Sequence, residues 1–331
     1  MKKLLIFVFS LLFSVTLVFG GTYIIVDRVT PDAVPEESVD MPIEGNANWL
    51  DVATNSRPGG SGTSSDPYRI DSAQTFANYM FMVNNDYRNT SNNVYYKNSY
   101  AKLTANINLS GKYWTPIGCQ NSNIFVNTTY QGTFDGNGYT INNLTMRVYE
   151  DDTVQFMGLF GYTSGATIKN IKIKYSLTVY AITEDGWWES ENCYAGGIIG
   201  RNMGSTKLDT VTILEGSKLT YNRSWDQLPF ESAYISNFVG YSSGSLDIDD
   251  CVCYGDIEII VSNQSRESKN ADLYCGGLIG YSSGELDVDF TCNYGDITIS
   301  QPTSTDNPHN DNYQIFPCRG NYWKVSRCVQ S

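Results

Sequence analysis

The segment CGGLIGYSSGELDVDFTCNYGDITI, residues 275–299, decides the fold, because a closely similar sequence occurs about 40 residues earlier in the chain. Residues 236–259 read SNFVGYSSGSLDIDDCVCYGDIEI. The glycines and the apolar positions recur, whereas the residues between them drift. Recurrence at a fixed spacing marks a repeat architecture, in which each unit packs on its neighbours.

Four blocks of the form small–apolar–apolar–Gly extend this pattern upstream. They are GLFG at 158–161, GIIG at 197–200, NFVG at 237–240 and GLIG at 277–280, and their final glycines lie 39 or 40 residues apart. Apolar residues recur at fixed distances after each block. We expect three stacked sets: Ile168, Leu208, Ile248 and Val288; Ile171, Val211, Cys251 and Thr291; Ile173, Ile213, Cys253 and Asn293.

The spacing inside each repeat predicts strands. Apolar residues alternate at a period of two in short segments broken by glycine, whereas helical repeats would show a period near 3.6. We therefore predict an all-β fold, a right-handed parallel β-helix (solenoid) whose successive turns stack about 4.8 Å apart. An amphipathic helix at about 72–87, behind a Ser72 N-cap, is predicted to cap its N-terminal end.

The N-terminus predicts export. Residues 1–21 are expected to be a signal peptide or an N-terminal membrane anchor, because Lys2 and Lys3 precede an apolar stretch without charges that suits either role. Both alternatives place the chain at the cell surface or outside the cell, where disulfides persist. We predict an acidic linker at 22–47, a cap and first coils at 48–131, repeats at 132–312, and a C-terminal cap or tail at 313–331.

Charge narrows the range of partners. The formal net charge is −13, and a surface of that sign repels phosphate, which argues against nucleic acid. Membrane contact is expected only through the N-terminal anchor, and we expect a monomer.

Longer stretches carry a family resemblance. GTFDGNGYTINNLT (132–145), FMGLFGYTSGATIKNIKI (156–173) and the later GIIG, NFVG and GLIG blocks resemble the bacterial GLUG-motif proteins. The upstream SGTSSDPYRIDSAQTFANYM and NINLSGKYWTPIG resemble the N-terminal region common in that group. The resemblance runs from about Trp49 to Ile299. It implies a secreted or cell-surface β-helix associated with adhesion and surface display, with no shared catalytic residues.

The segments that drift most are expected to emerge along one edge of the solenoid, where such folds often carry their functional loops. They are 179–192, 219–232, 261–272 and 300–311. They hold the aromatic residues that we predict to bind a ligand: Trp187, Trp188, Tyr221 and Trp225. The alternative is that these rings pack on one another inside the loops.

Two further sets of residues are candidates for sites. Asp209, Asp249 and Asp289 are expected to stack as a column that could attract Ca²⁺; the alternative is a solvated acidic face. No other cofactor is expected. Cys318 and Cys328 are predicted to form a disulfide that stabilises a C-terminal cap by about 2–3 kcal/mol. The other six cysteines could pair or stay buried.

Three functions fit these features. The first is a non-enzymatic adhesion or ligand-binding protein that holds an extracellular glycan or a surface protein through its edge loops. The second is a polysaccharide-degrading enzyme, a lyase or glycoside hydrolase, that uses acidic residues of the scaffold. The third is a structural surface spacer. Because the basic residues are scattered rather than grouped with acids, we predict no enzymatic activity.

Overall fold

The computed structural model describes residues 47–121, 126–149, 156–181, 192–223, 232–261, 272–300 and 328–329. The predicted leader, almost all of the predicted linker and almost all of the C-terminal segment 313–331 lie outside these residues. All described residues belong to one compact unit, Asp40–Ser331. In the part of the chain that is described, no helix is both long and apolar enough to cross a membrane.

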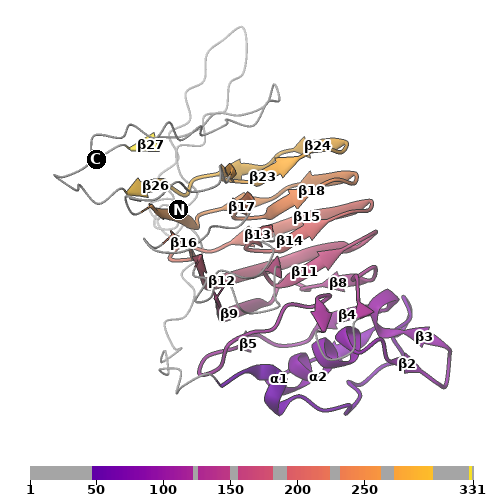
Figure 1. Cartoon of the computed structure of the whole chain (residues 1–331). Coiled ribbons are helices and arrows are strands. Elements are labelled where there is room, and N and C mark those ends of the chain that lie inside the picture. The colour runs from indigo at the N-terminus through magenta and orange to yellow at the C-terminus, as the bar shows by residue number, and fades with distance from the viewer. Residues whose placement is uncertain are drawn as a thin grey trace, which may run out of the picture. The chain divides into compact units, whose positions relative to one another are not determined.

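The described chain is mostly β, with long parallel sheets in a solenoid-like arrangement. Figure 1 shows the strands of successive repeats lying one above another, with the two helices at the N-terminal end of the stack. The main sheet has 15 strands, and two further sheets have four strands each. This confirms the prediction of a β-rich fold with parallel strands, while the right-handed β-helix stays a prediction.

The N-terminal part combines two helices with short strands. Its elements are α1 (Trp49–Val52), β1 (Tyr68–Ile70), α2 (Ala73–Asn84), β2 (Arg88–Asn89), β3 (Val94–Tyr95), the 3₁₀ helix η1 (Tyr96–Asn98), β4 (Tyr100–Leu103), β5 (Ile107–Asn108), β6 (Gln120–Asn121), β7 (Val126–Asn127), β8 (Thr133–Asp135) and β9 (Thr140–Tyr149).

Helix α2 begins where the sequence predicts it. The Ser72 side chain accepts a hydrogen bond from the backbone N–H of Thr75, which satisfies a donor that the first helical turn leaves open. The helix buries Phe76, Tyr79 and Met80 completely against the first strands. Because this apolar face covers the end of the stack, the described N-terminal end has a closed core.

Four repeats follow, defined here by their described residues. The first (156–181) contains β10 (Phe156–Met157), β11 (Phe160–Thr163) and β12 (Thr167–Ala181). The second (192–223) contains β13 (Cys193–Gly196), β14 (Ile199–Asn202), β15 (Thr206–Ile213) and β16 (Lys218–Arg223). The third (232–261) contains β17 (Ser232–Ser236), β18 (Val239–Ser242), β19 (Leu246–Asp249), β20 (Val252–Cys253) and β21 (Asp256–Val261). The fourth (272–300) contains β22 (Asp272–Gly276), β23 (Ile279–Ser282), β24 (Leu286–Asp289), β25 (Cys292–Asn293) and β26 (Ile297–Ser300), and β27 (Cys328–Val329) comes after it.

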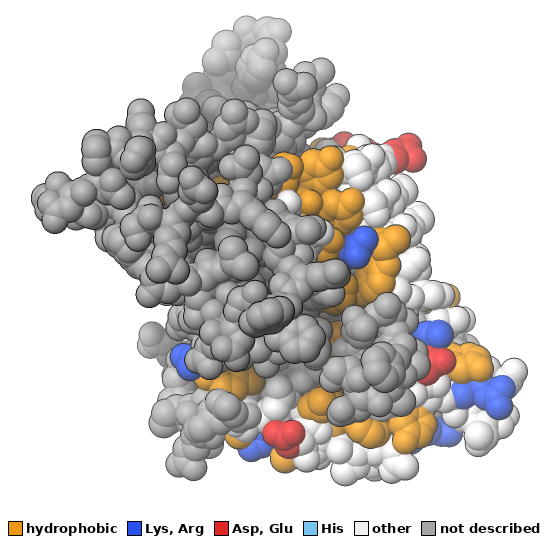
Figure 2. Space-filling view, in the orientation of Figure 1, with side chains coloured by type: hydrophobic (Ala, Val, Ile, Leu, Met, Phe, Trp, Pro, Cys, Tyr) orange, Lys and Arg blue, Asp and Glu red, His pale blue; other side chains and the backbone are white. Residues whose placement is uncertain are grey.

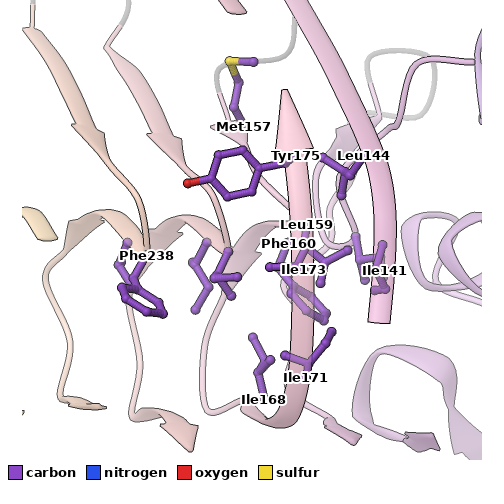
Figure 3. Packing of buried hydrophobic residues seen from close by; sticks show 14 of the residues in the cluster. Ile141, Leu144, Met157, Leu159, Phe160, Ile168, Ile171, Ile173, Tyr175 and Phe238 are labelled. Atoms are coloured by element: carbon purple, nitrogen blue, oxygen red, sulfur yellow. The ribbon is translucent and has the colours of Figure 1, made fainter. Parts of the chain in front are cut away.

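The register between repeats confirms the predicted stacking. Ile168 pairs with Leu208, Leu208 with Ile248, and Ile248 with Val288, all in parallel strands. The first three of these side chains are fully buried. Figure 3 shows Ile168, Ile171 and Ile173 pointing into the interior, where they meet residues of neighbouring strands. The apolar residues that recur in the sequence therefore point inward, and each packs on the equivalent residue of the neighbouring repeat.

The final glycine of each block faces the backbone of the repeat before it. A Cβ atom on Gly240 would lie 2.8 Å from the carbonyl oxygen of Gly200, and one on Gly280 would lie 2.5 Å from that of Gly240. Both distances are too short for a carbon atom. The block ends in glycine because neighbouring repeats approach too closely there for any side chain.

Each repeat also turns one corner through a left-handed backbone. The residues at this corner are Asn170, Thr210, Asp250 and Phe290, with φ between 46° and 57°. Asparagine and aspartate tolerate this conformation, whereas β-branched and bulky residues are strained in it.

An interior polar pair explains why the third block reads NFVG instead of GFVG. At the equivalent position of the second repeat, a Cβ atom on Gly197 would lie 2.4 Å from the Tyr175 ring. In the third repeat the Asn237 side chain accepts a 2.6 Å hydrogen bond from the Tyr175 hydroxyl and donates a 2.7 Å bond to the Gly255 carbonyl. The asparagine therefore satisfies the buried phenol of a side chain two repeats away.

Candidate binding surface

A column of outward aromatic rings runs along the sheet formed by β10, β13, β17 and β22. Phe156 pairs in register with Tyr194, Tyr194 with Tyr234, and Tyr234 with Tyr274. The residues next to them on the strands, such as Ala195 and Ile235, belong to the core. Since side chains alternate across a strand, the rings point outward. Successive ring centroids are 5.5, 5.3 and 5.0 Å apart, with planes within 19° of parallel.

A second column lies beside it, on β11, β14, β18 and β23, one residue after the final glycine of each block. Its members are Tyr162, Arg201, Tyr241 and Tyr281. The two columns touch: Tyr241 meets Tyr234 edge to face at 4.9 Å, and Tyr281 meets Tyr274 at 5.0 Å. We call the eight side chains of both columns the aromatic ladder. Figure 2 shows a band of hydrophobic side chains over the repeats, with a basic side chain inside it.

Six of the eight ladder side chains are partly exposed, whereas Phe156 and Tyr194 are buried, at 5% and 6% exposed. Within the first column the ring faces pack on one another, so they are not available to a flat ligand. Most members are half-buried, and burial raises the pKa of Tyr194 and of Tyr234. Their hydroxyls therefore stay protonated at neutral pH and can both donate and accept hydrogen bonds.

Arg201 takes the place of a tyrosine in the second column. Its guanidinium carbon lies 4.9 Å from the ring centroid of Tyr194, 5.5 Å from that of Tyr241 and 5.7 Å from that of Tyr162. None of the ion pairs between described residues involves Arg201. Its Nε atom is buried and has no hydrogen-bond partner. The ladder thus holds a positive group that forms no ion pair with a described carboxylate.

The predicted edge loops connect to this surface along the chain. Segments 182–191, 224–231 and 262–271 lead into β13, β17 and β22, the strands that carry the first column. These segments lie outside the described residues, so the structure does not place Trp187, Trp188 or Trp225. Their role in binding stays a prediction.

The prediction for Tyr221 is wrong. It lies in β16 rather than in a loop, and its side chain is only 3% exposed within the hydrophobic core. The reason is the alternation of β16, which turns Leu219 and Tyr221 inward together. A ring in this position packs the interior and cannot meet a ligand.

The acidic column has the predicted register. Asp209 pairs with Asp249, and Asp249 with Asp289. The cation beside it is a lysine: Lys207 Nζ lies 3.0 Å from Asp247 Oδ2 and 3.6 Å from Asp249 Oδ2. Among the described residues, no group of three or more His, Cys, Asp or Glu side chains is arranged to hold a metal ion. Calcium binding by the column stays a prediction.

The cysteines divide into placed and unplaced residues. Cys318 lies outside the described residues, and only the backbone of Cys328 is described, so the predicted disulfide stays a prediction. Cys251 and Cys253 are buried thiols, and burial raises the pKa of each to about 12. Both thiols are therefore protonated and packed as small apolar groups at neutral pH.

Comparison with known proteins adds no relative. No protein-family model matches the chain, and neither the search of curated proteins nor the search of solved structures found a match. The resemblance to the GLUG-motif proteins therefore stays a prediction.

The amino-acid sequence carries a signal for the ladder beside the inward apolar pattern that predicts the strands. A tyrosine stands six residues before the final glycine in the second, third and fourth blocks, and tyrosine or arginine follows that glycine in all four. The prediction of strands used only the inward apolar residues, so these outward tyrosines and Arg201 were not predicted to form a surface. Aromatic residues that recur outside the core are a sign of a built surface.

Proposed function

We propose that this chain is a non-enzymatic, exported binding protein that attaches to an extracellular glycan or surface protein. The scaffold in this proposal is a right-handed parallel β-helix, and the binding face is the aromatic ladder together with the edge loops that lead into it. The ladder is the observation that carries the proposal.

Three properties of the ladder support this function. It stacks six tyrosines with Phe156 and Arg201 across four repeats, where a surface with no task would carry mixed polar residues. Tyrosine brings a large contact area and a polar tip at low conformational cost, which suits recognition. The unplaced Trp187, Trp188 and Trp225 are close in sequence to the same strands.

Nothing in the described acidic residues favours catalysis over binding. The Asp209, Asp249 and Asp289 carboxylates lie on the main sheet and the nearby Lys207 pairs with two aspartates of that surface. A hydrolase or lyase would need a positioned acid and base at a groove. We therefore place the enzyme alternative second, and the spacer alternative third because a spacer needs no aromatic face.

The test is a screen of the purified full-length chain against glycan arrays and extracellular matrix proteins. The Trp187→Ala/Trp188→Ala variant and a Tyr241→Ser variant should each weaken the signal of any ligand at least about tenfold, as expected for loss of an aromatic contact. Tyr95→Ala, at an exposed tyrosine of β3 away from the ladder, is the control and should bind as the parent does. Absence of any ligand would refute the proposal, and release of sugar from a polysaccharide panel would favour the enzyme.

A further inference from the structure

Arg201 is the basic residue of the aromatic ladder, in a chain that is acidic overall. The chain has 22 basic and 35 acidic residues, and the described ion pairs use Arg69, Lys97, Lys169, Lys207 and Lys218. Arg201 is in none of these pairs. The strands of the two ladder sheets contain a single acidic residue, Asp272 at the start of β22. The described Asp columns lie on the main sheet and not on the strands of the ladder.

The three rings around Arg201 prepare it for one kind of partner. Tyr162 and Tyr241 lie on the strands before and after it, and Tyr194 lies beside it, all within 5.7 Å of the guanidinium carbon. These contacts hold the guanidinium in place and keep water from its faces. What remains is the N–H edge, which matches the two oxygens of a carboxylate. Because the side chain is already held, an anion would lose little affinity to ordering it.

The rest of the ladder matches a ligand with many hydroxyl groups. Each column has a tyrosine in three of its four repeats, and every repeat has at least one. Across four repeats the ladder spans about 14 Å at the usual strand spacing. Such a row of donors and acceptors suits a linear chain of hydroxylated units that runs along the stack.

A peptide is the weaker fit. Peptides bind sheets mainly by adding a strand to an open edge or by filling side-chain pockets. The strands in the middle of the ladder, β13, β14, β17 and β18, already have partners on both sides. Their backbone groups are therefore used within the stack.

We propose that the aromatic ladder binds a carboxylate-bearing glycan, whose carboxylate pairs with Arg201 while flanking tyrosine hydroxyls bond to the sugar hydroxyls. This inference rests on the proposed binding function and names its ligand class. The probes are oligogalacturonate and the same oligomer with its carboxylates methyl-esterified, which differ only in the charged group.

The full-length chain is titrated with both oligomers by calorimetry. The parent should bind the acidic oligomer at least about tenfold more tightly than the ester, the value of one charge-assisted hydrogen-bonded pair. Arg201→Gln should abolish this preference, and Arg201→Lys should retain part of it. The matched control is Arg88→Gln, because Arg88 also lies over a tyrosine ring, Tyr95, away from the ladder, and it should behave as the parent.

A second variant guards against loss of folding in the first. Tyr281→Arg places another guanidinium in the same column without removing a ring around Arg201, and it should increase the preference for the acidic oligomer. Equal binding of the two oligomers by the parent, an unchanged preference in Arg201→Gln, or binding of poly-glutamate in place of either oligomer would overturn the inference. If the parent binds neutral glycans or proteins only, this inference fails while the proposed function stands; if it binds nothing in either screen, both fail.

Discussion

The two ends of the described stack differ in how far their apolar side chains are buried. At the N-terminal end, α2 covers the core, and the large rings of Tyr68, Phe76, Tyr79 and Trp114 are at most 2% exposed. In the fourth repeat, Leu286 is 37% exposed, Phe290 84% and Tyr294 46%. Figure 1 shows α2 at one end of the stack and β23 and β24 toward the other.

Strand pairing differs in the same way. Among the described strands, β22, β23, β24 and β25 pair only with the repeat before them, and β26 alone has a further partner, β27. Leu246 and Leu286 are the same residue type at stacked positions, yet the first is 1% exposed and the second 37%. Burial in a repeat protein thus comes from the neighbour on each side, and a terminal repeat needs a cap.

Thiol chemistry should show the largest difference between the interior and the end of the stack. Burial raises the pKa of Cys251 and Cys253 from 9.0 to about 12, which lowers their thiolate fraction at pH 8 about a thousandfold, and access is blocked as well. Cys292 of the fourth repeat is exposed. Alkylation with iodoacetamide, mapped by mass spectrometry, should therefore modify Cys292 at least about a thousandfold faster than either buried thiol. Comparable rates would mean that the third repeat opens readily.

The same two thiols predict that the folded state becomes less stable at high pH. Their pKa is higher in the folded than in the unfolded chain, so the folded state holds the protons more tightly. Their contribution to stability is complete below pH 9 and is lost as the pH rises toward 12. Denaturant midpoints measured from pH 8 to pH 12 should fall across that range, and Cys251→Ala/Cys253→Ala should flatten the fall.

Loss of an aromatic ring should lower the free energy of unfolding far more at the N-terminal end, which α2 covers, than in the fourth repeat. Phe76 is fully buried and lies 4.6 Å from the Trp114 ring and 5.6 Å from the Phe134 ring, so Phe76→Ala should lower the free energy of unfolding by about 3–5 kcal/mol. Phe290→Ala is the matched change at the exposed end and should shift it by less than about 0.5 kcal/mol. Urea denaturation of both variants tests the pair. A large cost for Phe290→Ala would show that residues outside the described ones cover this ring.

The stacked leucines give a finer comparison. Leu246→Ala removes a side chain enclosed by repeats on both sides and should cost about 2–5 kcal/mol. Leu286→Ala removes one with a neighbour on one side only and should cost about 1 kcal/mol, in line with its smaller buried area. The ratio of the two values in urea denaturation is the result to compare. Equal costs would contradict an open fourth repeat.

The interior hydrogen bond between Tyr175 and Asn237 tests what holds distant repeats in register. Tyr175→Phe leaves the Asn237 carbonyl oxygen without its donor inside the core, which should cost about 1–3 kcal/mol. The double variant Tyr175→Phe/Asn237→Gly removes both partners and also the bond from Asn237 to the Gly255 carbonyl, so its cost should be less than the sum of the two single changes. If the loss of stability in the double variant equals the sum of the losses in the two single variants, the two side chains act independently. The explanation of Asn237 in the third block by its bond to Tyr175 would then be wrong.

The parallel stacking of the strands was predictable because equivalent interior positions carry similar side chains in successive repeats. Ile168, Leu208, Ile248 and Val288 are apolar at a 40-residue spacing because each packs on the next, and Ser72 is readable as a cap from local preference. Tyr221 was misread because its segment lacks glycine and drifts between repeats, although its alternation is that of a strand. The hydrogen bond between Tyr175 and Asn237 could not be predicted from the sequence. It joins residues 62 positions apart, and neither residue lies in a pattern that indicates the other.

The smallest effect concerns the corner that every repeat turns with a left-handed residue. Thr210 has φ 57°, where its branched Cβ is strained, whereas Asn170 occupies the same corner of the first repeat without that penalty. Thr210→Asn should therefore stabilise the chain by about 1 kcal/mol, slightly reduced by loss of the exposed hydrogen bond from Thr210 Oγ1 to Asp209. Thr212→Asn, on the same strand outside the corner, should instead destabilise slightly because asparagine disfavours strands. Melting temperatures of the two variants should thus move in opposite directions, and a decrease in both would show that the corner carries no strain.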